Sequence, residues 1–163
     1  RQLLAVQALA LTKSDIKLYI VGRSDNPVLK DQINDIVKEH GMEDKVKHFD
    51  YVEQEEKFAL YANCRGVLFI PKDEDLGYIT IEGMASSKPV ITARDSGGPL
   101  EFIDDRVTGY ICEPEAADIA KAIDELAADE NKAIEMGKKA KEKLGTLNMS
   151  WDNVVKELLK YAN

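Results

Sequence analysis

Short β-branched segments alternate with amphipathic segments along most of this chain, and this alternation restricts the possible folds more than any other feature. The segments with the length and composition of strands are 16–21, 46–49, 66–70, 89–92 and 109–111. Between them, the segments with apolar residues at helical spacing are 27–40, 53–63, 79–86 and 99–103. Strands separated by helices at this interval pair in parallel through crossover connections. The sequence therefore predicts a doubly wound, Rossmann-like α/β domain with helices on both faces of a parallel sheet.

Both ends of the chain have a helical pattern. Residues 1–11 have helical spacing without an N-cap before them, and the first residue is Arg1 rather than Met. We interpret the chain as one domain, residues 1–163, cut from a longer protein. From Glu115 onward the sequence is helical and charged, and the lysines of 138–143 are interleaved with glutamates, which predicts a solvated helix face.

Composition excludes several classes of function. The 163 residues are 44% hydrophobic, enough for one core, and the formal charge of -8 disfavours a nucleic-acid partner. No run approaches the roughly 20 apolar residues of a membrane-spanning helix. The two cysteines, Cys64 and Cys112, cannot form a disulfide framework, and neither clusters with His40 or His48. We expect a cytoplasmic, metal-free protein in which both cysteines pack as small apolar residues.

The loops that follow the strands are the place to search for a site, because ligands of open α/β sheets bind beyond the carboxyl ends of the strands. The loop 22–27 contains neither G-x-G-x-x-G nor G-K-[ST], which disfavours a nicotinamide enzyme or an NTPase. Gly97 and Gly98, before Pro99, fit a loop that faces a ligand and equally fit a turn into a helix.

The segment 71–85 carries more chemical information than any other loop. Glu74 lies in the loop and Glu82 on the following helix, with Gly77 between them where the backbone can turn tightly. Carboxylates accept paired hydrogen bonds from sugar hydroxyls, and free N–H groups at a helix start bind phosphate oxygens. This pattern suits a polyhydroxylated anionic ligand. The same residues also fit an ordinary helix whose glutamate interacts with the helix dipole, with Glu74 simply exposed.

The ordered motifs resemble the donor-binding half of the family 4 retaining glycosyltransferases, which have the GT-B fold. The residues that carry the resemblance are 74–85 (EDLGYITIEGMA), 88–91 (KPVI), 96–101 (SGGPLE) and 108–111 (TGYI). They match the family pattern E-x-F-G-x-x-x-x-E-A-M-A-x-G-x-P-V-I, followed by G-G-x-x-E. The resemblance covers nearly the whole chain, because Tyr51-Val52, Tyr61-Ala62, Trp151 and Tyr161 also stand where the family places such residues.

The resemblance implies transfer of a hexosyl group from a nucleoside-diphosphate sugar, with retention of configuration and without a metal ion or cofactor. In the family, Glu74 is the catalytic residue that holds the donor sugar, and Glu82 binds the ribose. The further donor-binding residues implied are Gly77, Tyr78, Ile79, Thr80 and Val52. In the family the acceptor lies against an N-terminal domain, which we expect to be missing from these 163 residues, and the Arg and Lys that hold the donor diphosphate are expected just before Arg1. We therefore expect the chain alone to be inactive.

Some positions depart from the family pattern. Leu76 replaces the usual Phe and Gly83 the usual Ala, while Ser87 and Asp50 stand where the family has Gly. The last two changes are expected to alter backbone geometry. Two rival interpretations remain: a non-catalytic module that binds sugar nucleotides, and another GT-B enzyme such as a sugar-nucleotide epimerase or a glycan phosphorylase. The phosphorylase needs a lysine for pyridoxal phosphate in a context that this sequence lacks.

Overall fold

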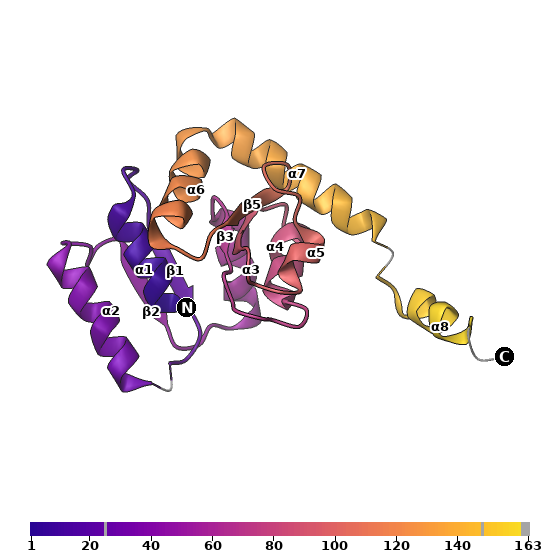
Figure 1. Ribbon diagram of the computed structural model, residues 1–163, viewed down its shortest axis with the longest axis horizontal. Coiled ribbons are helices and arrows are strands. Elements are labelled where there is room, and N and C mark those ends of the chain that lie inside the picture. The colour runs from indigo at the N-terminus through magenta and orange to yellow at the C-terminus, as the bar shows by residue number, and fades with distance from the viewer. Residues whose placement is uncertain (25, 148, 161–163) are drawn as a thin grey trace.

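The computed structural model describes residues 1–24, 26–147 and 149–160, apart from the side chains of Trp151 and Val154. Tyr161, part of the family resemblance, lies outside the described residues. Helices and strands alternate along the first two thirds of the chain (Figure 1). The elements are α1 (Gln2–Leu11), β1 (Leu18–Val21), α2 (Pro27–Glu39), β2 (Val46–Phe49), α3 (Gln54–Asn63), β3 (Val67–Leu68), α4 (Tyr78–Ala85), β4 (Val90–Ala93), α5 (Pro99–Phe102), β5 (Gly109–Cys112), α6 (Ala116–Ala128), α7 (Glu130–Thr146) and α8 (Trp151–Leu159).

All pairings between these strands are parallel, as the sequence predicts, but the strands form two sheets. β1 pairs with β2, and β3–β4–β5 form a second sheet in that order. Within the described residues no ladder joins β1 to β3, so the expected sheet is divided. The prediction of a parallel α/β domain is confirmed. Its division into two sheets cannot be predicted from the alternation of strands and helices along the sequence.

Helices cover both faces of the β3–β4–β5 sheet, and β4 demonstrates this directly. Every residue of β4 is buried, and its side chains alternate between two apolar clusters. Ile91 and Ala93 pack in a cluster with residues of α1 and α6, whereas Val90 packs in a cluster with residues of α4, α5 and α7. A strand buried on both faces requires this continuous apolar sequence. The doubly wound arrangement is therefore confirmed for this sheet.

A third apolar cluster holds the β1–β2 sheet to α1 and α2. Its buried members are Val6, Leu9, Ile33 and Met42. Asn26 caps α2 by accepting a hydrogen bond from the Leu29 N–H at 3.2 Å. Pro27 begins this helix, and Gly41, at φ 61°, follows its end. The helix bounds expected from these residues are confirmed.

Some local expectations from the sequence are wrong in detail. The predicted buried strand 66–70 pairs over only Val67–Leu68 in regular β structure, and both residues are half-buried. The helix α3, which the apolar spacing of 53–63 predicts, has no fully buried residue. The interleaved charges of α7 do form a solvated face, where Lys139 pairs with Glu135 at 2.8 Å. Among the described residues, no helix has the length and apolarity needed to cross a membrane.

Candidate functional site

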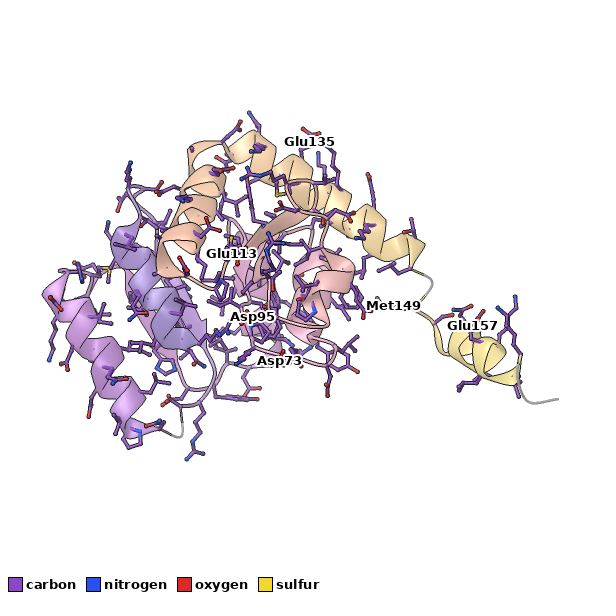
Figure 2. The ribbon with its side chains drawn as sticks, in the orientation of Figure 1. Asp73, Asp95, Glu113, Glu135, Met149 and Glu157 are labelled. Atoms are coloured by element: carbon purple, nitrogen blue, oxygen red, sulfur yellow. The ribbon has the colours of Figure 1, made fainter. Side chains whose placement is uncertain are left out.

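The loop that follows β3 runs beside the loop that follows β4. The Asp73 N–H donates to the Asp95 carbonyl at 3.0 Å, and the Glu74 N–H donates to the Ser96 carbonyl at 3.0 Å. In return, the Gly98 N–H donates to the Glu74 carbonyl at 2.7 Å. Figure 2 places Asp73 and Asp95 close together at one edge of the sheet. The backbone of Glu74 is therefore fixed by a second loop at the carboxyl ends of two neighbouring strands.

Gly77 ends this loop in a left-handed conformation and begins α4. Its φ and ψ are 76° and 64°, a region that residues with a Cβ rarely occupy. The backbone turn leaves the Tyr78 and Ile79 N–H groups in the first turn of α4, with no acceptor among the described residues. Both side chains are exposed, at 72% for Tyr78 and 40% for Ile79. The start of α4 can therefore present backbone donors to an anion.

Thr80 differs from its neighbours in this turn. Its N–H donates to the Gly77 carbonyl at 2.9 Å, so this group is not open to a ligand in the structure, contrary to the sequence expectation. Its side chain is fully buried, and its Oγ1 has no hydrogen-bond partner among the described residues. Among the described residues, the N–H groups at this helix start that have no acceptor are those of Gly77, Tyr78 and Ile79.

Glu74 offers a carboxylate that no described side chain engages. The residue is half-buried, its backbone is held by the neighbouring loop, and no hydrogen bond or ion pair to its Oε atoms is present among the described residues. A fixed backbone with an unengaged carboxylate is the arrangement expected of a group that accepts hydrogen bonds from a ligand.

Glu82, in the middle of α4, is held by two residues of α3. The Lys57 Nζ donates to Oε1 at 2.8 Å, and the Tyr61 hydroxyl donates to Oε2 at 2.9 Å. Burial and the hydrogen bond to Glu82 together raise the pKa of Tyr61 well above its usual value, so the phenol remains protonated and continues to donate. Sequence reasoning identified Glu82 but missed Lys57. The only signal available was that Lys57 and Tyr61 are spaced to share a helix face.

Arg1 connects the site loops to the start of α1. Its guanidinium forms a two-point ion pair with Asp95, at 2.7 and 2.6 Å, and reaches the Pro71 carbonyl at 3.4 Å. This hydrogen bonding holds the pKa of the Asp95 carboxyl below its usual value. The contact spans 94 positions of sequence, which explains why no local pattern predicts it.

The glycines after β4 have a packing role in this structure. A Cβ on Gly97 would lie 2.5 Å from the Glu74 carbonyl oxygen, and one on Gly98 would lie 2.2 Å from that of Asp75. The Gly98 N–H is already bonded to Glu74. Of the two sequence interpretations, the structure therefore favours close loop packing over a loop whose Gly98 amide faces a ligand.

The departures from the family pattern are visible in the backbone. Ser87 has φ 57°, in the left-handed region that favours glycine, which accounts for the glycine usual at this position. Gly83 is buried on α4, where a Cβ would lie 3.0 Å from Val67 Cγ2. The smaller residue therefore lets α4 approach the sheet closely.

Val52 is half-buried in the connection between β2 and α3, and its side chain has no polar contact among the described residues. His40 caps the end of α2, and the imidazole of His48 in β2 contacts the Gly22 carbonyl at 2.7 Å. The pKa of Cys112 is raised by burial to about 12, consistent with its role as an unreactive packing residue.

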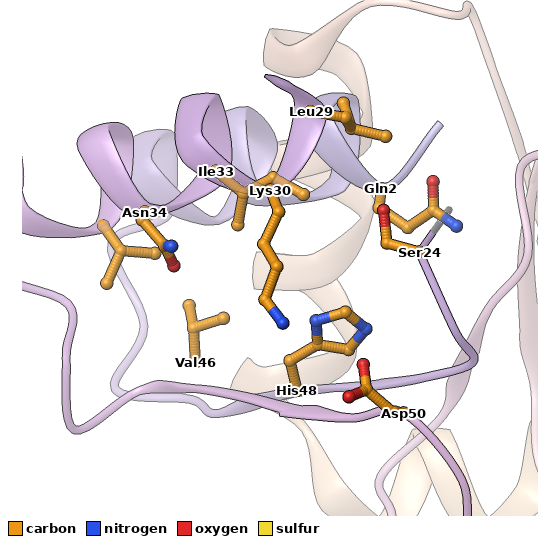
Figure 3. Close-up of a pocket in the computed structure, with 10 residues that line it drawn as sticks. Gln2, Ser24, Leu29, Lys30, Ile33, Asn34, Val46, His48 and Asp50 are labelled. Carbon is orange, nitrogen blue, oxygen red and sulfur yellow. The ribbon is translucent and has the colours of Figure 1, made fainter. Parts of the chain in front are cut away.

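A separate cavity of about 210 Å³ lies between α2 and β2. In Figure 3, Lys30 of α2 extends toward His48 of β2 across this cavity. Its lining residues are Gln2, Ser24, Leu29, Lys30, Ile33, Asn34, Val37, Val46, His48 and Asp50. None of these belongs to the 71–82 segment, so the cavity is distinct from the site built on Glu74 and Glu82.

The sequence of this chain is similar to that of known glycosyltransferases. Residues 1–143 match the family model described as glycosyl transferases group 1. The chain belongs to this family. Alpha-1,3/1,6-mannosyltransferase ALG2 of Dictyostelium discoideum is 34% identical over 126 residues, covering 77% of this chain and 30% of that protein. Human ALG2 is 31% identical over 147 residues, covering 82% of this chain and 35% of that protein.

Solved structures support the same conclusion for this group 1 glycosyltransferase chain. A complex of S. aureus TarM that contains UDP has a TM-score of 0.81 and 26% identity, covering 97% of this chain and 31% of that chain. Anabaena HepE, solved in complex with UDP and glucose, has a TM-score of 0.79 and 22% identity, covering 98% and 44%. The second similarity concerns the fold alone. The chain spans about a third of the length of the ALG2 relatives it matches.

Proposed function

We propose that this chain is the nucleotide-sugar donor-binding domain of a retaining glycosyltransferase, and that Glu74 and Glu82 bind opposite ends of the donor. The observation that supports this proposal is the arrangement around α4. One unengaged carboxylate precedes the helix, free N–H groups open its first turn, and a second carboxylate lies within it. A ligand with hydroxyls at both ends and phosphates between them has the complementary chemistry.

Each group has a distinct part in the proposed reaction. The N–H groups of Tyr78 and Ile79 donate hydrogen bonds to the diphosphate, where they stabilise the negative charge that develops as the bond between the sugar and the leaving phosphate breaks. Glu82 accepts hydrogen bonds from the ribose. Glu74 touches the transferred sugar and orients it for attack by the acceptor, which is why we assign it as the catalytic residue. Neither glutamate acts as a nucleophile in this proposal.

The remaining parts of the proposal concern the whole protein. We propose that an acceptor-binding domain and the basic groups that hold the diphosphate belong to the rest of the full-length protein, because the chain covers only 30% and 35% of two ALG2 relatives. The 163 residues alone should then bind donor weakly and transfer no sugar. Transfer needs no metal ion or cofactor, because backbone amides and basic side chains neutralise the leaving group. We place the protein in the cytoplasm and propose that its donor substrates there are nucleoside-diphosphate sugars.

A calorimetric panel tests the donor assignment with the full-length protein. UDP-, GDP- and ADP-linked sugars are titrated separately, with GDP-mannose first because the ALG2 relatives and a GDP-mannose-dependent relative are named mannosyltransferases. We expect saturable binding of at least one donor. Binding of none of the three classes by a folded protein would overturn the proposal.

The same calorimetric experiment on a Glu82 variant tests whether the donor binds at the proposed site. Glu82→Gln removes the charge while keeping the size of the side chain, and a hydrogen bond to a charged group contributes about 1.5–3 kcal/mol. Donor affinity should therefore fall by about 10- to 150-fold. Glu142→Gln, on the exposed surface of α7, is the matched control and should leave the affinity unchanged. Equal affinities for the two variants would remove Glu82 from the site.

A further inference from the structure

The carboxylate of Glu82 is held at both oxygens by residues one helical turn apart on α3. We propose that Lys57 is a positioning residue which, together with Tyr61, orients Glu82 toward the ribose of the donor nucleotide. This inference rests on the proposed function, because it concerns the same glutamate. No part of the sequence pattern that identifies Glu82 includes Lys57.

The hydrogen-bond geometry supplies the first argument. Lys57 uses one acceptor position of Oε1 and Tyr61 uses one of Oε2, at 2.8 and 2.9 Å. A carboxylate has about four acceptor positions, so one remains on each oxygen. Two adjacent hydroxyls, as in the 2′,3′-diol of a ribose, can donate to these two positions. The α3 residues thereby fix the plane of the carboxylate and leave its outer side open.

Exposure indicates that this outer side is accessible. The Glu82 side chain is 36% exposed and that of Lys57 is 29% exposed, so the pair lies at the surface between α3 and α4. Ion pairs with this degree of exposure contribute little to folding, because solvent screens them and ordering two long side chains costs entropy. The contribution of this ion pair to folding stability therefore does not explain the lysine. Holding the Glu82 carboxylate in the orientation that binds the ligand does explain it.

Charge supplies the second argument. A nucleoside diphosphate is strongly anionic, and an uncompensated carboxylate near its ribose would repel it. The chain itself carries a formal charge of -8, which adds to this repulsion. The Lys57 ammonium neutralises Glu82 and still leaves one acceptor position on each carboxylate oxygen. Lysine at this position thus permits a glutamate to bind the sugar of an anionic ligand.

The test measures discrimination between ribose and deoxyribose in the full-length protein. UDP, GDP and ADP are each compared with the corresponding 2′-deoxynucleoside diphosphate by calorimetry. The variants are Lys57→Met, Lys57→Gln, Lys57→Arg and Glu82→Gln. The matched control is Lys139→Met, which removes another lysine paired with a glutamate at 2.8 Å, on α7. Urea unfolding midpoints are recorded for every variant, and Lys57→Gln replaces Lys57→Met if the latter does not fold.

We expect Lys57→Met to lower the affinity for the preferred ribonucleotide about tenfold and to lower the affinity for its deoxy counterpart by less, because that ligand lacks one of the two hydroxyls that Glu82 binds. The preference for ribose should shrink equally in Glu82→Gln. Lys57→Arg should keep most of it, because the charge and a donor remain. Lys139→Met should have no effect.

Several outcomes would overturn the inference. One is a Lys57→Met protein that keeps its ribose preference while Glu82→Gln loses it. Another is an equal loss for the ribo and deoxy ligands, which would assign the lysine to the phosphates or to the fold. A wild-type protein that binds nucleotides without preferring ribose would refute the role of Glu82 in ribose binding, and this inference with it, while leaving donor binding intact. Absence of any nucleotide or sugar-nucleotide binding would instead refute the proposed function itself.

Discussion

Replacing Gly77 with alanine perturbs the turn that positions the first helical turn of the site. The backbone at Gly77 has φ 76°, and the residue is buried. An added Cβ would lie 2.8 Å from Cγ of Pro99 and 3.1 Å from Cε1 of Phe69. Pro99 begins α5, and its ring cannot rotate away as a flexible side chain could. The substitution therefore adds a steric conflict to an unfavourable backbone conformation.

The two contributions can be estimated separately. A left-handed conformation costs a residue with a Cβ about 1–2 kcal/mol. Inserting a methyl group into a packed site costs about 1–3 kcal/mol. Together they predict a loss of about 2–5 kcal/mol in the free energy of unfolding, a large part of the roughly 5–15 kcal/mol available to a domain. Because Gly77 is buried and its added Cβ would meet Pro99 and Phe69, Gly77→Ala should reduce stability as well as donor binding.

Two other glycines provide matched controls. Gly41 has φ 61°, but nothing lies within 4 Å of an added Cβ, so Gly41→Ala incurs only the backbone cost. Gly145 lies in α7 with nothing within 4 Å of its added Cβ, so Gly145→Ala should be neutral or stabilising by up to about 1 kcal/mol. The difference in the free energy of unfolding between the Gly77 and Gly41 variants therefore measures the contribution of the packing against Pro99.

Urea denaturation of the 163-residue chain, followed by circular dichroism, measures all three variants under one set of conditions. We expect the largest loss for Gly77→Ala, a loss of about 1–2 kcal/mol for Gly41→Ala, and none for Gly145→Ala. If Gly77→Ala were no more destabilising than Gly41→Ala, the packing of the turn against Pro99 would be refuted.

The remaining predictions concern Glu74 and Asp95. Glu74→Ala should reduce sugar transfer by the full-length enzyme but leave binding of the free nucleoside diphosphate nearly intact; equal weakening of that ligand and of the complete donor would assign Glu74 to the nucleotide. The Asp95 pKa is lowered in the folded chain, mainly by its hydrogen bond to Arg1, so this stabilisation is complete above an unfolded pKa of about 3.9 and disappears as the pH falls through the lowered folded value. The stability difference between wild type and Asp95→Asn should therefore vanish at low pH in urea titrations, and a difference that persisted there would contradict an electrostatic origin.

The candidate site could be predicted in part from sequence. The two glutamates and the intervening glycine follow from spacing along one loop and one helix, and the left-handed turn follows from the absence of a side chain at Gly77. The partners of those residues could not be predicted. Lys57 reaches Glu82 across 25 positions, and no periodic pattern reports contacts between separate elements. The hydrogen bond from the Thr80 N–H to the Gly77 carbonyl could not be predicted either, because residue spacing does not show which amide closes the first helical turn.

The order and type of the elements can be predicted from local sequence, because strand and helix periodicity, Pro27, Gly41 and similar signals act over a few neighbouring residues. The division of the parallel strands into two sheets, and the pairing of the loops after β3 and β4, emerge only in the folded chain. The ion pair through which Arg1 holds those loops at Asp95 also forms only there. These features depend on which distant segments meet when the apolar clusters pack, and that choice is made by the free energy of the whole fold rather than by any local segment.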